Sequence, residues 1–419
     1  MPSLHTLLAL ALPPTAVLFA LLQPRLSLLG VGRAPHPALN VGECSPLEGL
    51  EACEDVWVDR DGGVAYLACS SLALRATWSP SQLALTSPVG PSHSPSTPPD
   101  SLRVFDYTSG THKAVELTGM PEEAGGRVWV HGMDGVALPS SSSSSSASEK
   151  GERELLLALI SHRPPPPSLS NPSAAAAKAQ QQGADSVVEL FVTSSGSSTA
   201  AHVQTVAHPL VRTPNNLVLD YSEKEGRVKG FWVSNDHAEK VGWRRKLELV
   251  WQPTSEIVYC ALREEEGVEG EQCWVAAEGI RYPNGLAKGP NDLLYGASTF
   301  SGEITVYEIQ HDKSLLPLDT IPLSRPIDNL HLSPLTHALY AATFPKMLDF
   351  ASAVPVPEDP ERPKRSRSAV EVWRVGEETG EGRFYGHKYR TDVVLADPSG
   401  EVVSAIISAA PFKDTLLLT

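Results

Sequence analysis

Short hydrophobic segments with strand-like alternation dominate the chain. Successive side chains of a β-strand face opposite sides, so alternation of apolar and polar residues is typical of strands. The clearest such segments are VAYLACSS (64–71), RVWVHGM (127–133), ELLLALIS (154–161), SVVELFVTS (186–194), KGFWVSND (229–236), SEIVYCAL (255–262), EITVYEIQ (303–310) and HALYAATF (337–344). Turns rich in glycine, proline, asparagine and aspartate separate them, and amphipathic helical patterns are few. The pattern predicts an all-β fold.

Four segments place oxygen-bearing side chains at the start of a strand. RTPNNLVLD (212–220), RYPNGLAKG (281–289) and RPIDNLHLS (325–333) share an arginine, a nearby proline and polar residues before leucine. CEDVWVDRDGG (53–63) puts two acids before an alternating Val-Trp-Val. Tens of residues separate these segments, as expected for one segment per blade of a β-propeller that carries insertions.

The same four segments predict a metal site. Loops that enter the innermost strands of a propeller meet at its central channel. Glu54 and Asp328 would bring two negative charges there, and Asn215, Asn284 and Asn329 would bring neutral oxygens. Ca²⁺ takes about 6–8 oxygen ligands. For any one segment taken alone, an Asx turn is the better explanation, but the shared strand-entry context of all four favours a calcium cage.

Residues 1–31 form a separate N-terminal segment. Residues 7–22 (LLALALPPTAVLFALL) are almost wholly apolar, which is typical of a secretory signal or an uncleaved membrane anchor. Two prolines interrupt the run and no A-x-A cleavage site follows it, so retention as an anchor is slightly favoured. We therefore expect a protein of the secretory pathway, membrane-anchored or extracellular, with a membrane surface or lipid as partner through its N-terminus.

Residues 42–419 are expected to form one propeller domain interrupted by disordered loops. Low-complexity insertions lie at about 86–100, 139–153, 164–184 and 356–368. Their proline, serine, alanine and glutamine runs or charged tracts bury too little apolar surface to offset the entropy of ordering.

Composition and cysteine spacing exclude several function classes. The 419-residue chain holds 49 Asp and Glu against 34 Lys and Arg, which argues against nucleic acid as a partner. P-loop, dinucleotide-binding and G-x-S-x-G motifs are absent from the sequence. The five cysteines lack zinc-ligand spacing, and an odd number leaves at least one unpaired. Cys260 and Cys273 flank a hairpin-like turn, and a disulfide or two buried thiols are both open there.

These segments resemble the paraoxonase/arylesterase family, whose members are six-bladed propellers with two calcium ions in a central tunnel. The similar stretches are CEDVWVD, VHGM, VVELFV, TPNNLVLD, SNDH, AEGIRYPNGL, VYE and IDNLHLS, and they follow the family's order over most of residues 44–345. The resemblance implies that this chain is a six-bladed β-propeller. It also implies that Glu54, Asn215, Asn284, Asp328 and Asn329 match the ligands of the catalytic calcium.

Further roles are implied for five other positions. Asp55, Asn216 and the backbone carbonyl of Met133 match the structural calcium site of the family. His131, in VHGM, and His162, in LISHRP, match the two histidines of the family's proposed catalytic dyad. For a lone histidine in a strand, a satisfied core or rim position is the competing interpretation, so the histidines rank below the calcium ligands.

Three departures from the family pattern alter the expectations. Asn216 stands where the family has aspartate, which predicts a weak second calcium site because ligand charge tunes affinity. Phe344 aligns with a tunnel-mouth histidine, so substrate preference is expected to differ. The sequence stops at Thr419, whereas relatives continue through a strand whose cysteine pairs with the equivalent of Cys44, so ring closure is expected to differ.

The function that follows is a calcium-dependent hydrolase of lactones and aryl esters, with phosphotriesters as side substrates. Calcium would polarise the carbonyl, and a water activated by His131, which His162 orients, would attack. Glu54 or Asp328 could serve as the base instead. Two alternatives are a non-catalytic, calcium-stabilised binding propeller and a strictosidine-synthase-like propeller that works without calcium.

Overall fold

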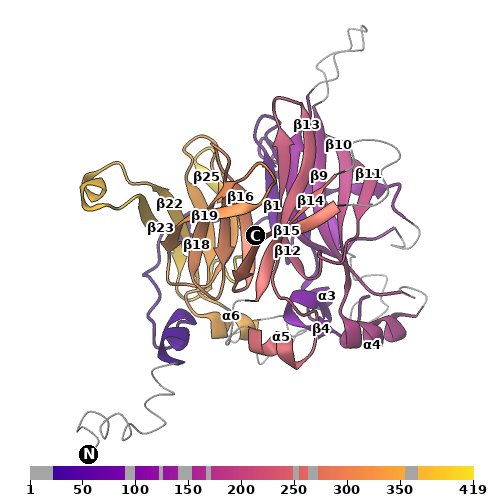
Figure 1. Cartoon of the computed structure of the whole chain (residues 1–419), viewed down its shortest axis with the longest axis horizontal. Coiled ribbons are helices and arrows are strands. Elements are labelled where there is room, and N and C mark those ends of the chain that lie inside the picture. The colour runs from indigo at the N-terminus through magenta and orange to yellow at the C-terminus, as the bar shows by residue number, and fades with distance from the viewer. Residues whose placement is uncertain are drawn as a thin grey trace, which may run out of the picture.

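The chain folds as an all-β propeller. The computed structural model describes residues 22–89, 100–121, 126–139, 153–166, 171–248, 254–262, 272–353 and 367–419. These residues form five blades of four or five strands, antiparallel except where β7 pairs with β11. Every strand segment expected from the alternation overlaps a strand of the structure. The sheets stand side by side (Figure 1), and their innermost strands β1, β8, β12, β16 and β20 contact one another.

The first two blades hold nine strands. Blade 1 consists of β1 (Asp55–Asp59), β2 (Val64–Cys69), β5 (Ser101–Asp106) and β6 (Thr111–Ala114). Blade 2 consists of β8 (Val130–Ala137), β9 (Glu154–Arg163), β10 (Asp185–Ser194), β11 (Thr199–Val206) and β7 (Glu116–Thr118).

Blades 3 to 5 each follow chain order from the inside outwards. Blade 3 is β12 (Pro214–Ser222), β13 (Arg227–Asn235), β14 (Ser255–Ala261) and β15 (Gln272–Ile280). Blade 4 is β16 (Pro283–Lys288), β17 (Leu293–Ser298), β18 (Glu303–Ile309) and β19 (Leu315–Pro322). Blade 5 is β20 (Ile327–Leu332), β21 (Leu339–Thr343), β22 (Val370–Glu377) and β23 (Tyr389–Asp397).

A two-stranded hairpin lies between blades 5 and 1. It consists of β24 (Ala409–Phe412) and β25 (Thr415–Leu418), and β24 contacts both β20 and β1. Ala410 and Leu417 pack into the core of blade 1, while Ala409 packs against the core of blade 5. The expectation of six full blades is therefore met only in part, because the described residues after β23 supply two strands where a complete blade has four.

Short helices gather along one end of the propeller, at the bottom of Figure 1. They are α3 (Leu72–Arg75), α4 (Pro172–Gln182), α5 (Trp243–Glu248) and α6 (Met347–Ala353). The small ribbon β3 (Trp78–Ser79) and β4 (Ala84–Leu85), the 3₁₀ turns η1 (Val41–Glu43), η2 (Pro80–Gln82) and η4 (Glu381–Tyr385), and a helix over residues 22–28 complete the elements. No helix in the described ranges combines the length and apolar character that a membrane span requires.

The expectation of a disordered loop over residues 164–184 is wrong for residues 172–182, which form α4. The Asn171 side chain accepts a hydrogen bond from Ala174 N (3.1 Å), Pro172 starts the helix and Gly183 follows it. Alanine has the highest helix propensity, and buried Ala179 packs into a cluster with Trp78 and Trp129. The alanine- and glutamine-rich composition, which suggested disorder, instead forms a helix that packs against the propeller. The other three insertions fall largely outside the described residues, as do residues 1–21.

The cysteines form two disulfides. Cys260 pairs with Cys273 directly opposite it on β14 and β15, which resolves the alternative left open by the sequence. Cys53 pairs with Cys69, a bridge that the sequence did not indicate. Cys44 is the remaining free thiol, as an odd count requires. Two disulfides fit an oxidising compartment.

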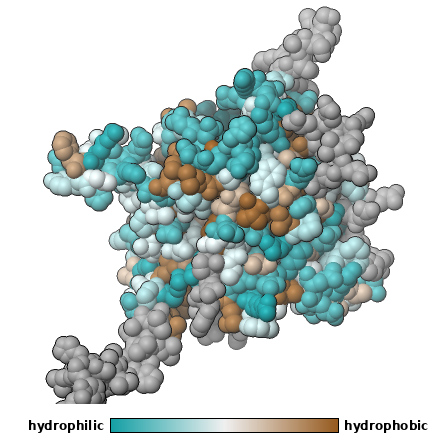
Figure 2. Space-filling model, viewed as in Figure 1, coloured by the Kyte–Doolittle hydropathy of each residue, from teal (hydrophilic) through white to brown (hydrophobic). Residues whose placement is uncertain are grey.

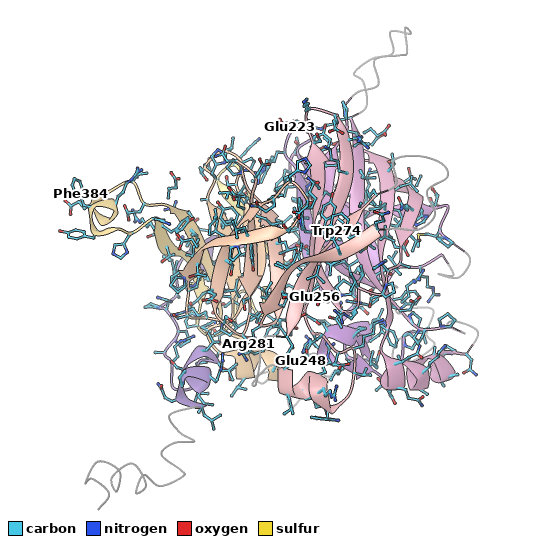
Figure 3. The ribbon with its side chains drawn as sticks, viewed as in Figure 1. Glu223, Glu248, Glu256, Trp274, Arg281 and Phe384 are labelled. Atoms are coloured by element: carbon cyan, nitrogen blue, oxygen red, sulfur yellow. A yellow bond between two sulfur atoms is a disulfide. The ribbon has the colours of Figure 1, made fainter. Side chains whose placement is uncertain are left out.

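The surface agrees with the acidic composition. The face seen in Figure 2 is largely hydrophilic, with hydrophobic patches across its middle. The β22–β23 connection projects from blade 5 and carries Phe384 at its tip (Figure 3), where 95% of that residue is exposed. The hydrophobic cores lie between adjacent blades, which leaves polar residues to line the channel.

Candidate functional site

The innermost strands break their pairing at the same place in four blades. Pairing registers skip two residues in β8, β12, β16 and β20. The skipped pairs are His131-Gly132, Asn215-Asn216, Asn284-Gly285 and Asp328-Asn329. Such irregularities leave residues without a partner in the strand pairing and change the direction of their side chains. They explain why polar residues stand together in the sequence at these points: the released pairs are buried at the channel.

Glycine allows the inner strands to approach one another there. A Cβ at Gly132 would lie 2.4 Å from the Asn215 carbonyl oxygen, and one at Gly285 would lie 2.4 Å from Leu330 N. Backbone cannot yield at such distances, so these two positions require glycine. These close approaches join blade 2 to blade 3 and blade 4 to blade 5.

We call Glu54, Asn215, Asn284, Asp328 and Asn329 the cage set. Asn284 Nδ2 donates to Thr299 Oγ1 at 3.2 Å, because that hydroxyl itself donates to the Ile327 carbonyl (2.7 Å). Asn284 also hydrogen bonds to Asp328. Its Oδ1 is buried and has no hydrogen-bond partner among the described residues. A buried amide oxygen without a partner is costly and calls for a ligand.

The two carboxyl groups of the cage set destabilise each other's ionised form. Burial raises the pKa of Asp328 well above its usual range, and the neighbouring Glu54 carboxylate adds to the rise. Burial also raises the pKa of Glu54, although the Arg75 guanidinium opposes this effect. A divalent cation would remove the repulsion. No group of three or more His, Cys, Asp or Glu side chains gathers within the described ranges, so amide oxygens would have to complete the coordination. Glu54, Asn284 and Asp328 fit a hard cation such as Ca²⁺, whereas the Asn329 oxygen already accepts a hydrogen bond from Asn216 Nδ2 at 3.1 Å.

Asp55, Asn216 and Met133 lie deeper in the channel and behave differently. Asn216 Nδ2 donates to Asp55 Oδ2 at 2.8 Å, and Met133 N donates to the same oxygen at 3.0 Å. The structure brings these three residues together as the sequence predicted. Both Asp55 oxygens and the Asn216 amide already have hydrogen-bond partners, so these two side chains do not fit a second cation.

The predicted histidine pair lies beside the cage set. The rings of His131 and His162 are in tilted contact, with centroids 4.9 Å apart. His162 Nδ1 hydrogen bonds to Ser186 Oγ at 2.8 Å, whereas both ring nitrogens of His131 have no hydrogen-bond partner among the described residues. No hydrogen bond therefore joins the two rings. His131 Nε2 lies 3.4 Å from Glu54 Oε1.

Both histidines are neutral at physiological pH. Burial and, to a smaller extent, the Arg75 guanidinium lower the pKa of His131 to about 3. Burial and the neighbouring His131 lower the pKa of His162 well below its usual value. Neutral imidazoles can accept a proton, but a base with so low a pKa accepts it weakly.

Arg75 is a site residue that the sequence did not indicate. It ends α3, and its Nη2 lies 3.6 Å from Glu54 Oε2. Its Nε and Nη2 are buried without a hydrogen-bond partner among the described residues. Nothing in the stretch LALR marks this arginine, because only the fold brings the end of α3 next to Glu54. Phe344, which aligns with the tunnel-mouth histidine of the family, is buried and stacks on Phe350 of α6.

Two cavities differ in size and place. One of about 290 Å³ lies on the Asp55 side of the channel and is lined by Trp57, Asp134, Asn216, Lys288 and His331 among others. A second, lined by His162, Ser186, Asp236 and Arg245, measures only about 10 Å³.

Comparison with known proteins gives matches over about half of the chain. A family model for arylesterase matches residues 177–377. Human serum paraoxonase/arylesterase 1 is 28% identical over 167 residues, which is 39% of this chain and 42% of the human protein. Mouse serum paraoxonase/lactonase 3 is 25% identical over 179 residues, 42% of this chain and 46% of the mouse protein. The chain thus matches less than half the length of these curated relatives.

Solved structures give weaker likenesses. A periplasmic gluconolactonase from Pseudomonas aeruginosa has 11% identity and a TM-score of 0.41, covering 84% of this chain and 75% of that one. A luciferin-regenerating enzyme has 11% identity and a TM-score of 0.40, covering 87% and 81%. At these TM-scores neither likeness bears on function.

Proposed function

Because this chain belongs to the paraoxonase/arylesterase family, we propose that it is a calcium-dependent hydrolase of lactones and aryl esters, with phosphotriesters as side substrates. The observation that carries the proposal is the unpartnered, buried Asn284 Oδ1 beside the Glu54 and Asp328 carboxyl groups. These oxygens supply the donor set that a calcium ion needs.

The cage set would hold the ion, with Glu54 and Asp328 providing its counter-charge. Calcium bound there would supply Lewis-acid polarisation of the ester or lactone carbonyl and stabilise its developing negative charge. His131, neutral and free of hydrogen bonds to the described residues, orients the attacking water and accepts its proton. His162 keeps the His131 ring in place by ring contact and is itself fixed by Ser186. Glu54, 3.4 Å from His131 Nε2, is the alternative proton acceptor.

A panel of γ- and δ-lactones and aryl esters tests the proposal. With calcium present, we expect hydrolysis of at least one class well above the uncatalysed rate, measured by pH-stat or by release of the phenol. Heat-denatured protein is the control for background hydrolysis. Failure to hydrolyse any member of the panel by calcium-loaded, folded protein would contradict the proposal.

One observation favours a second candidate, a calcium-stabilised binding propeller without catalysis. The cavity beside His162 has a volume of about 10 Å³, about the space that one water requires. This space is too small for a lactone. Tight calcium binding together with an inactive panel would favour this candidate.

We also propose that the N-terminal segment holds the protein at a membrane or lipid surface in the secretory pathway. The apolar run precedes a segment attached to the propeller: Arg25 donates to the Phe300 carbonyl (3.3 Å) and Arg33 to the Ser324 carbonyl (2.8 Å). Deleting residues 1–21 spares these contacts, so the truncated protein should keep its melting temperature but move from the membrane fraction to the soluble fraction. Full-length protein that is soluble without detergent, with its N-terminus intact by mass spectrometry, would contradict the anchor.

A further inference from the structure

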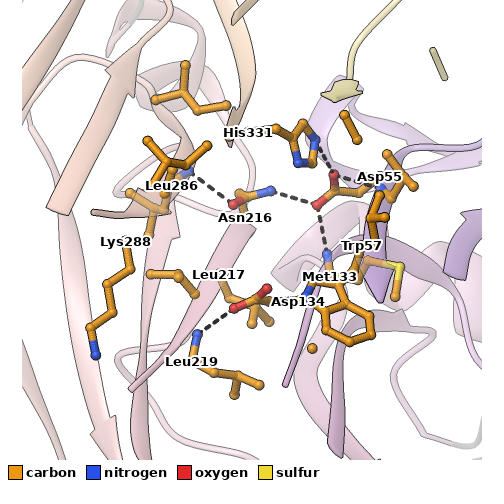
Figure 4. A pocket seen from close by; sticks show the side chains of 18 of the residues that line it. Asp55, Trp57, Met133, Asp134, Asn216, Leu217, Leu219, Leu286, Lys288 and His331 are labelled. Atoms are coloured by element: carbon orange, nitrogen blue, oxygen red, sulfur yellow. Dashed lines mark hydrogen bonds and ion pairs between the residues drawn. The ribbon is translucent and has the colours of Figure 1, made fainter. Parts of the chain in front are cut away.

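A hydrogen-bonded group at the centre of the channel links the inner strands directly. We call it the clasp and define it as Asp55, Asn216 and Asn329 (Figure 4 shows Asp55 and Asn216). Asn216 Nδ2 donates to Asp55 Oδ2 at 2.8 Å and to Asn329 Oδ1 at 3.1 Å. Asn329 Nδ2 in turn donates to the Glu54 carbonyl at 3.0 Å. All three residues are almost fully buried.

The orientation of the Asn216 amide is fixed by the backbone of blade 4. Leu286 N donates to Asn216 Oδ1 at 3.0 Å. A backbone N–H can only donate, so the oxygen of the amide must face Leu286 and its NH₂ group must face Asp55. Turning the amide over would set its NH₂ group against Leu286 N–H and leave both donors unpaired, which is costly for buried groups.

Asp55 has its oxygens occupied in the same way. Its Oδ2 accepts from Met133 N (3.0 Å) as well as from Asn216. Its Oδ1 accepts from Ser408 Oγ and from Val56 N, each at 2.9 Å. Short hydrogen bonds to both oxygens keep this buried carboxylate satisfied without a cation.

We infer that the clasp replaces the second calcium ion expected from the family resemblance, so that the folded chain binds one calcium ion, in the cage set. A cation requires lone pairs directed at it, whereas Asn216 directs two N–H groups towards Asp55 and Asn329. The clasp also cross-links the inner strands, as a bound ion would. Its hydrogen bonds join β1, β8, β12, β16, β20 and the residue before β24. The expectation of one calcium ion in the cage set rests on the proposed function. The inference that no calcium binds at the clasp rests on the hydrogen bonds alone.

Calcium stoichiometry tests the inference. After gel filtration in buffer with micromolar calcium, atomic emission should find one calcium per wild-type chain and two per chain of Asn216→Asp. The matched control is Asn291→Asp, which makes the same change at an exposed turn residue and should still bind one. Two tightly held ions in the wild type, or no more calcium in Asn216→Asp than in the wild type, would overturn the inference. Wild type with none and Asn216→Asp with one would refute the cage site but support the clasp.

Melting temperature gives a second readout that does not depend on activity. In EGTA, Asn216→Asp sets a second carboxylate against Asp55, so its melting temperature should fall by roughly 5 °C or more and recover with calcium. Asn216→Ala removes the clasp without adding charge; it should also melt lower in EGTA and should keep one calcium. It therefore decides the case if Asn216→Asp does not fold. Unchanged melting of both variants in EGTA would show that the clasp does not hold the strands.

Discussion

Chelation with EGTA is expected to abolish hydrolysis of lactones and aryl esters, by roughly 10³-fold or more, and added calcium should restore it. Without a cation, the Asn284 oxygen has no hydrogen-bond partner among the described residues, and the Glu54 carboxylate repels that of the buried Asp328. The carbonyl of the substrate would then meet no positive charge from the cage set. Initial rates in EGTA, before and after calcium is added back, measure the effect.

Two controls separate loss of the ion from loss of the fold. Circular dichroism in EGTA reports whether the propeller persists, and excess Mg²⁺ added with EGTA tests the kind of ion, because Mg²⁺ demands a tighter octahedral site. Full activity in excess chelator would contradict the mechanism.

Asn284→Ala is expected to reduce kcat/KM by roughly 10²–10³-fold, whereas His162→Gln should reduce it by only about 10-fold. Asn284→Ala removes the buried oxygen that has no partner but keeps both carboxylates, whereas His162 contacts the site only through the ring of His131. Asn291→Ala, the same change at an exposed turn, should leave the rate unaltered. A larger loss of kcat/KM for His162→Gln than for Asn284→Ala would contradict the expectation that the metal site contributes more to catalysis than the histidine pair.

Stability should respond to Asp328 in the opposite direction from activity. The pKa of Asp328 is raised in the folded state, so its stabilising contribution is complete below its unfolded value of about 3.9 and is lost as pH rises through the folded-state pKa. At neutral pH in EGTA, Asp328→Asn should therefore raise the melting temperature. With calcium present, the same substitution should lower both activity and the calcium-dependent gain in melting temperature.

Local chemistry made much of the fold predictable. Alternation marked the strands, and a proline with asparagine or aspartate marked the points where β12, β16 and β20 enter the channel. Strands and turns depend mainly on residues close in the sequence, so they can be predicted without knowing which distant residues they contact in the fold. The residues of the cage set were found for the same reason, because the register shifts that expose them recur at equivalent places in the blades.

Composition misled where packing outweighed it. The alanine- and glutamine-rich run was interpreted as a disordered loop, but three alanines of α4 are buried against the propeller and make it an ordered helix. Cys53 and Cys69 pair across neighbouring segments of blade 1, and nothing in their spacing distinguishes them from Cys44. The place of the β24–β25 hairpin is also a tertiary feature, because it is set by contacts of β24 with β20 and β1, which are distant in the sequence.

The sequence by itself determined an all-β propeller and the buried oxygen-bearing residues that meet in its channel, since both follow from patterns a few residues long. The tertiary structure decided how those residues are used. Arg75 stands beside Glu54 only because folding brings the end of α3, 21 residues further along the chain, next to the strand entry of blade 1. Asn216 turns its NH₂ group rather than its oxygen towards Asp55 because the N–H of Leu286, 70 residues away, takes the oxygen. The direction of a hydrogen bond depends on the partner that folding delivers, and no local pattern contains that partner.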